Sequence, residues 1–362
     1  MDIVIVGHVD HGKSTLVGRL LADTDSLAAG RLDAAKAKCA EQGKPFEYAS
    51  LLDALKDEQE HGITIDAARV FFRSDKRSYL IHDAPGHVEF VRNMVTGAAR
   101  AEAAVLVVDV ELGVQENTRR HAYLLGLLGI PQIVVAATKM DRVAYSRERF
   151  EDVAQEAASW LERVAVAPCV VLPVSGGSGA GVARSSENLW WFRGPTLLEA
   201  LDGLGERPSR VSAPFRLPVQ AVYKWVRDGD DRRILAGTIQ AGRVRVGDEV
   251  VFYPSATRAR VRTIEAFHRS TPTEACAGEA TGLTIEPEVY VPRGSVVARA
   301  DEPQPEVGTR LAASLFWLGR KPLPLGHDVR IRIDTAAEPA RLESIERRLD
   351  AHTLEASEGD VR

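Results

Sequence analysis

The residues with the clearest chemical potential stand near the start of the chain, where the strand-like run Ile3–Val6 leads into GHVDHGKS, Gly7 to Ser14. This run has the pattern G-x-x-x-x-G-K-[ST], and a helical pattern follows it, as the motif requires. Glycines let the backbone curl so that its N–H groups face phosphate oxygens, and the N-terminus of the following helix attracts the same anion. We therefore expect a nucleoside triphosphate site, in which Lys13 reaches the β- and γ-phosphates and the Ser14 hydroxyl binds Mg²⁺.

A second motif, D-x-x-G, follows the strand-like run Tyr79–Ile81 in HDAPGH at 82–87. We expect Asp83 to hold Mg²⁺ through water and the Gly86 N–H to contact the γ-phosphate. Taken alone, the same residues are also compatible with an ordinary Asp-Pro-Gly turn. His87 comes next and is placed to orient the attacking water, because phosphoryl transfer depends mainly on positioning and electrostatics.

The base is indicated by TKMD at 138–141, which follows another buried strand-like run. In [NT]KxD motifs the aspartate accepts hydrogen bonds from N1–H and the exocyclic amine of guanine, and adenine offers neither donor there. Binding of adenine would leave the carboxylate without hydrogen-bond donors, which costs free energy, so Asp141 predicts a site that prefers GTP to ATP. Asn is commoner at the first position, and Thr138 can make only part of the hydrogen bonds of an amide.

Two further segments complete the expected site. Ser175 follows the strand-like run Val170–Val174 and is expected to bring its backbone N–H to guanine O6, although a plain loop remains the alternative. Thr64 lies in EQEHGITID at 58–66 and is expected to add its hydroxyl to Mg²⁺ and its N–H to the γ-phosphate. A loop ordered only by the γ-phosphate would act as a switch.

The complete expectation is a catalytic His87, a nucleotide site and a magnesium site. The residues expected at the nucleotide are Gly7, His8, Val9, Asp10, His11, Gly12, Lys13, Ser14, Thr15, Gly86, Thr138, Lys139, Asp141, Ser175 and Gly176. The residues expected at Mg²⁺ are Ser14, Thr64 and Asp83. The histidines near the first motif have neither an HExxH pattern nor a cysteine partner, so we expect no transition-metal site there.

Composition limits the class of protein around this site. The chain has 362 residues, of which 45% are hydrophobic and 27% charged, which predicts globular domains rather than a disordered chain. Its net charge of −5 argues against a strongly basic nucleic-acid surface. Three scattered cysteines give no disulfide framework and indicate a reducing, cytoplasmic setting. No apolar run reaches the roughly 18–20 residues of a membrane span, and the N-terminus lacks a signal-peptide pattern.

The elements that must position the site alternate between strand and helix over the first two hundred residues. Several of the strand-like runs are apolar on successive residues, as in strands buried on both faces of a parallel sheet. The predicted strands are Ile3–Val6, Tyr79–Ile81, Ala104–Val108, Ile133–Ala137 and Val170–Pro173. The predicted helices contain Leu16–Leu21, Glu116–Leu128 and Arg147–Val164. This order predicts an α/β domain with a doubly wound, mostly parallel sheet.

The pattern changes near Pro208, after which strands are short and turns are frequent. We expect a phosphate-loop domain over 1–207, a small β-barrel over 208–302 and a partial second β-barrel over 303–362. The roughly 55–60 residues of the last piece are few for an independent barrel. GGSGAGVARSS at 176–186 has the composition of a flexible loop.

GHVDHGKST, HGITID, DAPGH and TKMD, in this order and spacing, resemble the translation-factor class of GTPases, which includes elongation factor Tu and elongation factor 1-alpha. The resemblance implies a GTPase domain followed by two barrels. It also matches Val9 and Ile63 to the apolar gate that flanks the catalytic histidine in this class, which corresponds to His87.

Within that class the chain is most similar to the large, GTP-binding subunit of sulfate adenylyltransferases. The resemblance covers nearly the whole chain. The supporting stretches are GVQENTRRHAYLLGLLGI at 113–130, SENLWWFRGPTLLEAL at 186–201, FRLPVQAVYK at 215–224, LAGTIQAGRVRVGDEV at 235–250, AGEATGLTIEPEVYVPRGSVVA at 277–298 and FWLGRKPLPLG at 316–326. The TRRH and GEAxxL…RG segments discriminate best, because elongation factor 1-alpha proteins share several of the others.

This resemblance implies a subunit that couples GTP hydrolysis to the adenylation of sulfate by ATP, carried out by a separate small catalytic subunit. It implies GTP and Mg²⁺ as cofactors and no sulfate site in this chain. An elongation-factor-like carrier of aminoacyl-tRNA is the alternative. The net charge of −5 and the lack of a dense Lys/Arg stripe in the β region argue against nucleic-acid binding.

Overall fold

The computed structural model describes residues 1–27, 29–41, 43–52, 68–83, 101–164, 166, 168–205, 210–224, 232–266, 271–317, 319, 321, 323–349 and 356–358. The chain divides into two compact units, Met1–Glu206 with Leu349–Ala356 and Arg207–Arg348 with Ser357–Arg362. The predicted boundaries after 207 and 302 stay predictions. None of the helices in the described residues is long and apolar enough to span a membrane.

The first unit is built on a six-stranded sheet with the strand order β2-β3-β1-β4-β5-β6. Its strands are β1 (Asp2–Gly7), β2 (Ala68–Arg73), β3 (Ser78–Asp83), β4 (Ala103–Asp109), β5 (Ile133–Thr138) and β6 (Val170–Pro173). β1 pairs in parallel with both β3 and β4, and the parallel pairing continues through β5 to β6. Only β2, at the edge, is antiparallel, pairing with β3. The predicted mostly parallel sheet is confirmed.

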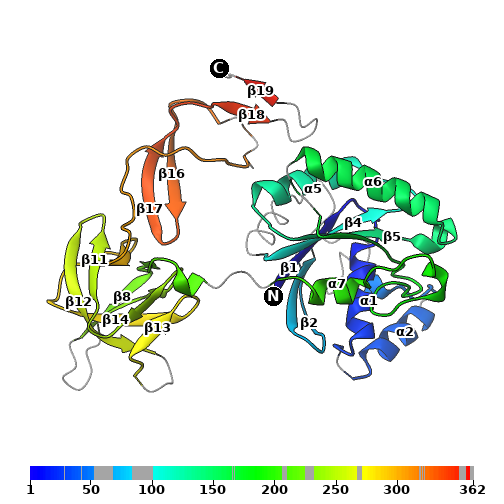
Figure 1. The fold of residues 1–362 in the computed structure, drawn as a ribbon, viewed down its shortest axis with the longest axis horizontal. Helices are drawn as coiled ribbons and strands as arrows, with labels where there is room; N and C mark the ends of the chain where they lie inside the picture. Colours follow the sequence, from blue (N-terminus) through cyan, green and yellow to red (C-terminus); the bar gives the residue numbers. More distant parts are fainter. Residues whose placement is uncertain are drawn as a thin grey trace. The chain divides into compact units, whose positions relative to one another are not determined.

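Helices cover both faces of this sheet (Figure 1). Among the described residues of the unit, the helices are α1 (Lys13–Asp23), α2 (Arg31–Glu41), α5 (Glu116–Leu127), α6 (Arg147–Arg163) and α7 (Leu197–Asp202), with short 3-10 turns η1 (Tyr48–Leu51), η3 (Met140–Val143) and η4 (Glu187–Leu189). α5 and α6 lie on one side, and α1 and α7 lie on the other (Figure 1). Fully buried aliphatic side chains fill the space between α1 and the sheet, among them Leu16, Leu20, Ile3 and Ile5.

The middle of the predicted flexible loop at 176–186 is packed instead. Ala180, Gly181 and Val182 are buried, and a Cβ on Gly181 would lie 2.4 Å from the carbonyl oxygen of Pro173. The carbonyls of Gly181 and Val182 accept the backbone N–H groups of Leu197 and Leu198, at 2.9 Å each. Gly181 therefore serves close packing, which composition alone could not distinguish from flexibility.

The second unit contains a closed β-barrel. Its main sheet has the order β7-β15-β11-β12-β14-β9-β8. The strands are β7 (Leu217–Pro218), β8 (Ala221–Lys224), β9 (Arg233–Thr238), β10 (Arg243–Arg245), β11 (Glu249–Tyr253), β12 (Thr257–Glu265), β13 (Glu274–Cys276), β14 (Ala280–Glu286) and β15 (Val296–Arg299), after a 3-10 turn η5 (Arg210–Ser212). β7 and β8 are two halves of one segment, so their pairing with β15 and β9 closes the sheet on itself. Phe215, Phe252 and Leu283 lie in its core.

Beyond this barrel the structure contains two isolated strand pairs, β16 (Asp328–Ile333) with β17 (Ala336–Arg341), and β18 (Arg347–Leu349) with β19 (Ala356–Glu358). No described residue between 303 and 349 is buried. The antiparallel sheets agree with the predicted class of an α/β domain followed by β-barrel modules. The partial second barrel over 303–362 stays a prediction.

Candidate functional site

The site lies where the strands of the parallel sheet end. The register pairs Ile5 with Asp83 and Asp109 with Thr138, so the carboxyl ends of β1, β3, β4 and β5 meet at one edge. β1 lies between β3 and β4, and its neighbours are therefore reached by connections that run in opposite directions. Ligands of open α/β sheets bind at such a switch point, outside the carboxyl ends of the strands.

The loop from Gly7 to Gly12 has positive φ angles at both ends, a conformation that favours glycine. Gly7 has φ 151°, and a Cβ there would lie 2.4 Å from the carbonyl oxygen of Val107 on β4. Gly12 has φ 86°, and a Cβ there would meet nothing within 4 Å. Helix α1 begins directly afterwards, and its N-cap residue, Gly12, has no side chain with which to cap it. The orphan N–H groups of this helix end are what a phosphate group would bind.

Lys13 is buried at the first position of α1, and its Nζ donates to the carbonyl oxygen of His8 at 2.6 Å. Burial lowers the pKa of Lys13 from 10.5 to about 8, although Asp83 and Asp10 favour the charged form. A partly desolvated cation that is bonded to its own loop is suited to an incoming anion, since phosphate oxygens supply the charge that its surroundings lack.

Ser14 and Asp83 come together from separate elements. The Ser14 hydroxyl donates to Oδ2 of Asp83 at 2.9 Å, across the first turn of α1 and the end of β3. A hydroxyl and a carboxylate beside the phosphate loop are the oxygen donors that Mg²⁺ takes when it is shared with substrate phosphates. These two predicted residues therefore fit the ion. Thr64, the third, lies outside the described residues.

Two buried histidines hold the phosphate loop, and sequence reasoning did not assign them this role. The backbone N–H of Gly7 donates to Nδ1 of His121 on α5, at 3.1 Å. The backbone N–H of Asp109 donates to Nδ1 of His11, also at 3.1 Å. Burial, followed by the charge of Lys13, lowers the pKa of His121 to about 3. Burial, followed by the neighbouring His8, lowers the pKa of His11 to about 4. Both rings are therefore neutral acceptors at neutral pH.

Thr138 and Lys139 also fasten the loop to the sheet edge. The Thr138 hydroxyl lies 2.7 Å from the carbonyl oxygen of His11 and 3.2 Å from that of Val108, so it bridges the phosphate loop and β4. Lys139 forms an ion pair with buried Asp109, with 2.7 Å between Nζ and Oδ2. Burial would raise the pKa of Asp109, but Lys139 and the Glu111 N–H hold it below its usual value.

Asp141 is exposed, and its orientation is fixed by Ser175. The Ser175 hydroxyl donates to Oδ1 of Asp141 at 2.5 Å. The Ser175 backbone N–H, which we expected at guanine O6, donates to the carbonyl oxygen of Ala180 at 2.9 Å. Gly176 lies against the first turn of α1, where an added Cβ would be 3.1 Å from Cγ2 of Thr15. In this structure Ser175 therefore contacts Asp141 through its side-chain hydroxyl.

The described site accordingly joins the loop residues 7–15, including His8, Val9 and Asp10, to Asp83, Thr138, Lys139, Asp141, Ser175 and Gly176 at one edge of the sheet. Gly86 and His87 lie outside the described residues, as does Ile63. Their predicted roles stay predictions.

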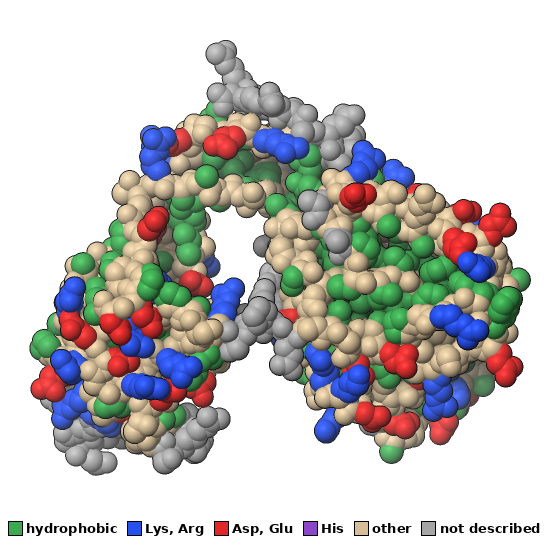
Figure 2. Space-filling view, viewed as in Figure 1, with side chains coloured by type: hydrophobic (Ala, Val, Ile, Leu, Met, Phe, Trp, Pro, Cys, Tyr) green, Lys and Arg blue, Asp and Glu red, His purple; other side chains and the backbone are tan. Residues whose placement is uncertain are grey.

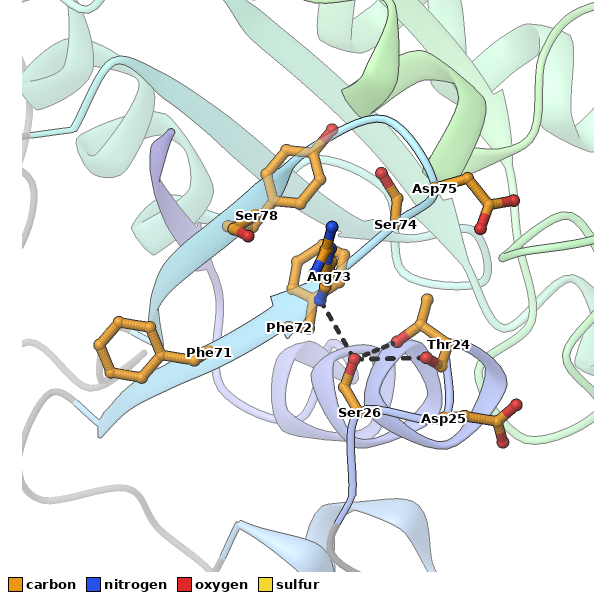
Figure 3. A pocket seen from close by; sticks show the side chains of 10 residues that line it. Thr24, Asp25, Ser26, Phe71, Phe72, Arg73, Ser74, Asp75 and Ser78 are labelled. Atoms are coloured by element: carbon orange, nitrogen blue, oxygen red, sulfur yellow. Dashed lines mark hydrogen bonds between the residues drawn. The ribbon is translucent and has the colours of Figure 1, made fainter.

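A separate pocket opens between the loop after α1 and the hairpin of β2 and β3 (Figure 3). Thr24, Ser26 and Arg73 are among the residues that line it, and Ser26 Oγ accepts the Arg73 backbone N–H at 3.1 Å. It contains none of the residues predicted to contact nucleotide or metal. The sheet edge, rather than this pocket, is the candidate functional site.

A doubly wound sheet with a glycine-bounded loop, a buried lysine and an uncapped helix N-terminus defines a phosphate-loop nucleotide-binding protein. The model of the elongation factor Tu GTP binding domain matches residues 1–206. The chain therefore belongs to the family of GTPases that carry this domain.

Relatives that match nearly the whole of this chain have more than one function in their names. The chain is 37% identical to sulfate adenylyltransferase subunit 1 of Laribacter hongkongensis over 360 residues, which cover 98% of this chain and 74% of that protein. It is also 37% identical to elongation factor 1-alpha of Pyrococcus furiosus over 364 residues, covering 98% of this chain and 84% of that protein. A solved structure of a bacterial selenocysteine-specific elongation factor is 26% identical, with a TM-score of 0.44, and covers 83% of this chain and 45% of that one.

Proposed function

We propose that this chain is the GTP-hydrolysing subunit of a sulfate adenylyltransferase. In this proposal a separate small catalytic subunit converts ATP and sulfate to adenylyl sulfate and diphosphate in the cytoplasm. That step is strongly unfavourable because the phosphate–sulfate anhydride is a high-energy bond. GTP hydrolysis in this chain would drive it through a coupling free energy between two sites.

The proposal starts from the match to sulfate adenylyltransferase subunit 1 over 98% of this chain, a coverage that elongation factor 1-alpha equals. Overall identity does not separate this group from elongation factor 1-alpha. The TRRH segment at 118–121 and the GEATGL…PRG stretch at 278–294 favour the sulfate-activating group. We assign no residue of this chain to sulfate.

The proposed roles within the nucleotide site follow from its geometry. Lys13 and the N-terminus of α1 bind the phosphates, while Ser14, Asp83 and Thr64 hold Mg²⁺, which supplies positive charge beside the phosphates. We place Gly86 at the γ-phosphate and His87 at the attacking water.

The base-reading role belongs to Asp141, whose exposed carboxylate is oriented by Ser175. It accepts hydrogen bonds from N1–H and the exocyclic amine of guanine. Lys139 and Gly176 complete the base pocket, and Thr138 holds the phosphate loop beneath it.

The experiment is to recover the tagged full-length chain from its source cells with a slowly hydrolysed GTP analogue. The eluate is then exchanged into GTP and assayed for sulfate-dependent diphosphate release from ATP. We expect a second protein subunit in the eluate and a release rate that GTP increases. Aminoacyl-tRNA in the eluate without sulfate-dependent release would instead favour an elongation-factor-like carrier, to which 37% identity to elongation factor 1-alpha also points.

A matched variant shows whether GTP stimulates the complex by binding to this chain or by binding to another protein in the eluate. Asp141→Asn replaces an acceptor pair by an amide, which suits the O2 carbonyl of xanthine better than the amine of guanine. We expect GTP to lose its stimulation of that complex and xanthosine triphosphate to restore it. Unchanged stimulation by GTP would show that the nucleotide acts at another site.

A further inference from the structure

Trp191 is joined to the turn that follows the base-reading carboxylate. Its indole Nε1 donates to the carbonyl oxygen of Tyr145 at 2.9 Å. The indole also contacts Phe150 of α6 and its neighbour Phe192, with ring centroids 5.4 and 6.1 Å away. Trp191 is thus held by packing, and its one polar hydrogen is directed at the backbone of the turn.

That turn has an unfavourable backbone conformation that needs support. Ala144 and Tyr145 have φ angles of 49° and 57°, in the left-handed region that side chains other than glycine rarely adopt. They end the 3-10 turn η3, which contains Asp141. The Tyr145 N–H donates to the carbonyl oxygen of Met140 at 2.8 Å, and the Tyr145 carbonyl oxygen accepts the indole N–H of Trp191.

A hydrogen-bond chain leads from the turn back to Asp141. The Tyr145 hydroxyl donates to Oγ of Ser178 at 3.0 Å, and the Ser178 backbone N–H donates to Oγ of Ser175 at 3.2 Å. The Ser175 hydroxyl then donates to Oδ1 of Asp141. The two loops that flank the carboxylate are therefore connected through Tyr145, and Tyr145 is held by Trp191.

We propose that Trp191 is a positioning residue for guanine recognition: it fixes the Ala144–Tyr145 turn and, through Tyr145, Ser178 and Ser175, the direction of the Asp141 carboxylate. This rests on the proposed base-reading role of Asp141. The bond that Trp191 makes ends on Tyr145, in the turn after Asp141, and not on a residue of the phosphate loop, so its effect falls on the base and not on the phosphates.

The test uses the purified full-length chain and measures affinity for GDP, GTP and inosine diphosphate by calorimetry. Inosine lacks the exocyclic amine, so it forms only one of the two hydrogen bonds to Asp141. Trp191→Phe keeps a six-membered aromatic ring against Phe150 and Phe192 and removes the five-membered ring of the indole, which carries the N–H. We expect its affinity for GDP to fall about fivefold, which corresponds to about 1 kcal/mol, the contribution of one hydrogen bond. Its affinity for inosine diphosphate falls less than twofold, and the ratio of GTP to GDP affinity is unchanged.

Two further variants keep the result interpretable. Trp190→Phe changes the adjacent indole, which is 74% exposed, and should leave all three affinities as they are in the wild type. Tyr145→Phe removes the hydrogen bond from the Tyr145 hydroxyl to Ser178. Like Trp191→Phe, it should lower the ratio of the affinity for GDP to the affinity for inosine diphosphate. It decides the question if Trp191→Phe does not fold, as judged by circular dichroism.

Equal losses for GDP and inosine diphosphate in Trp191→Phe would overturn the proposal, because they would indicate a general structural role. Wild-type affinity for GDP in that variant would overturn it as well. If the wild type binds GDP and inosine diphosphate equally well, the proposed base-reading role of Asp141 is wrong, and the proposal for Trp191 is wrong with it. None of these measurements involves sulfate or the small subunit, so they are independent of the test of the proposed function.

Discussion

Among single residues, the buried histidines have a property that solution measurements can detect. His121 is 1% exposed and accepts the Gly7 N–H only while its ring is neutral. Its pKa is about 3, against 6.5 in the unfolded chain, so between these values the unfolded state binds the extra proton. The stability that neutral His121 contributes is therefore fully present above pH 6.5 and is lost as the pH falls from 6.5 towards 3.

We predict that replacing His121 removes part of this acid sensitivity. From pH 7 to pH 5, one histidine with such a shift costs about 2 kcal/mol of unfolding free energy. His121→Asn keeps an acceptor for the Gly7 N–H but cannot titrate, so it should lose about 2 kcal/mol less than the wild type over that range. Urea unfolding followed by circular dichroism at both pH values measures the difference.

His121→Leu is the matched variant, because it has neither a proton site nor an acceptor. It should already be less stable than His121→Asn at pH 7, by about 1–3 kcal/mol, since the buried Gly7 N–H is left without a partner. If His121→Asn loses as much stability as the wild type between pH 7 and pH 5, the ring is not the neutral acceptor inferred here.

At the scale of elements, the junction between β1 and α1 places different demands on its two glycines. A Cβ on Gly7 would lie 2.4 Å from the Val107 carbonyl oxygen, which belongs to the backbone of β4 and cannot move independently. A Cβ on Gly12 would lie more than 4 Å from the described atoms other than those of its chain neighbours, so it costs only the positive φ of 86°, about 1 kcal/mol.

We predict opposite outcomes for alanine at these two positions. Gly7→Ala should separate β1 from β4 and destabilise the first unit by several kcal/mol, or prevent folding. Gly12→Ala should fold with a loss of about 1 kcal/mol yet bind GDP at least tenfold more weakly, because its methyl group stands at the helix end that phosphates approach. Thermal unfolding and GDP titration of both variants test this. A stable Gly7→Ala protein with normal GDP affinity would contradict the strand–loop geometry.

Much of the element order could be predicted from the sequence. The apolar runs at Ile3–Val6, Ala104–Val108 and Ile133–Ala137 became β1, β4 and β5, because strands buried on both faces need continuous apolar sequence. β2 was not predicted. It is an antiparallel edge strand in which Val70 and Phe72 face the core, but the exposed Phe71 between them hides this alternation in the sequence.

The site was predicted only as far as local motifs reach. Lys13, Ser14 and Asp83 follow from short patterns, and the structure brings them together. His121 lies 114 residues from Gly7, so a tertiary contact that no spacing rule describes connects them. The contact of Trp191 with the Tyr145 carbonyl could not be predicted for the same reason.

For the whole molecule, the charge on the barrel bears on the choice between the two candidate functions. Basic and acidic side chains are interspersed on the face of the barrel that Figure 2 shows. Several of its arginines are paired with carboxylates: Arg232 with Glu265, Arg243 and Arg245 with Glu274, Arg258 with Glu249, and Arg299 with Asp248, Asp301 and Glu302. Arginines already paired with carboxylates are poor ligands for RNA phosphates, because binding RNA would leave the carboxylates beside a polyanion.

We therefore predict that the GTP-analogue-bound chain binds aminoacyl-tRNA no more tightly than about 10 µM at 0.1 M salt, in the range of non-specific binding. Filter binding at 50 and 200 mM KCl measures the affinity and its salt dependence. As a control, Glu274→Gln with Glu249→Gln releases Arg243, Arg245 and Arg258 and should tighten RNA binding and steepen its salt dependence. Nanomolar binding by the wild type, weakened by orders of magnitude between the two salt concentrations, would show that the barrel contacts phosphates despite its paired arginines and would favour the carrier function over sulfate activation.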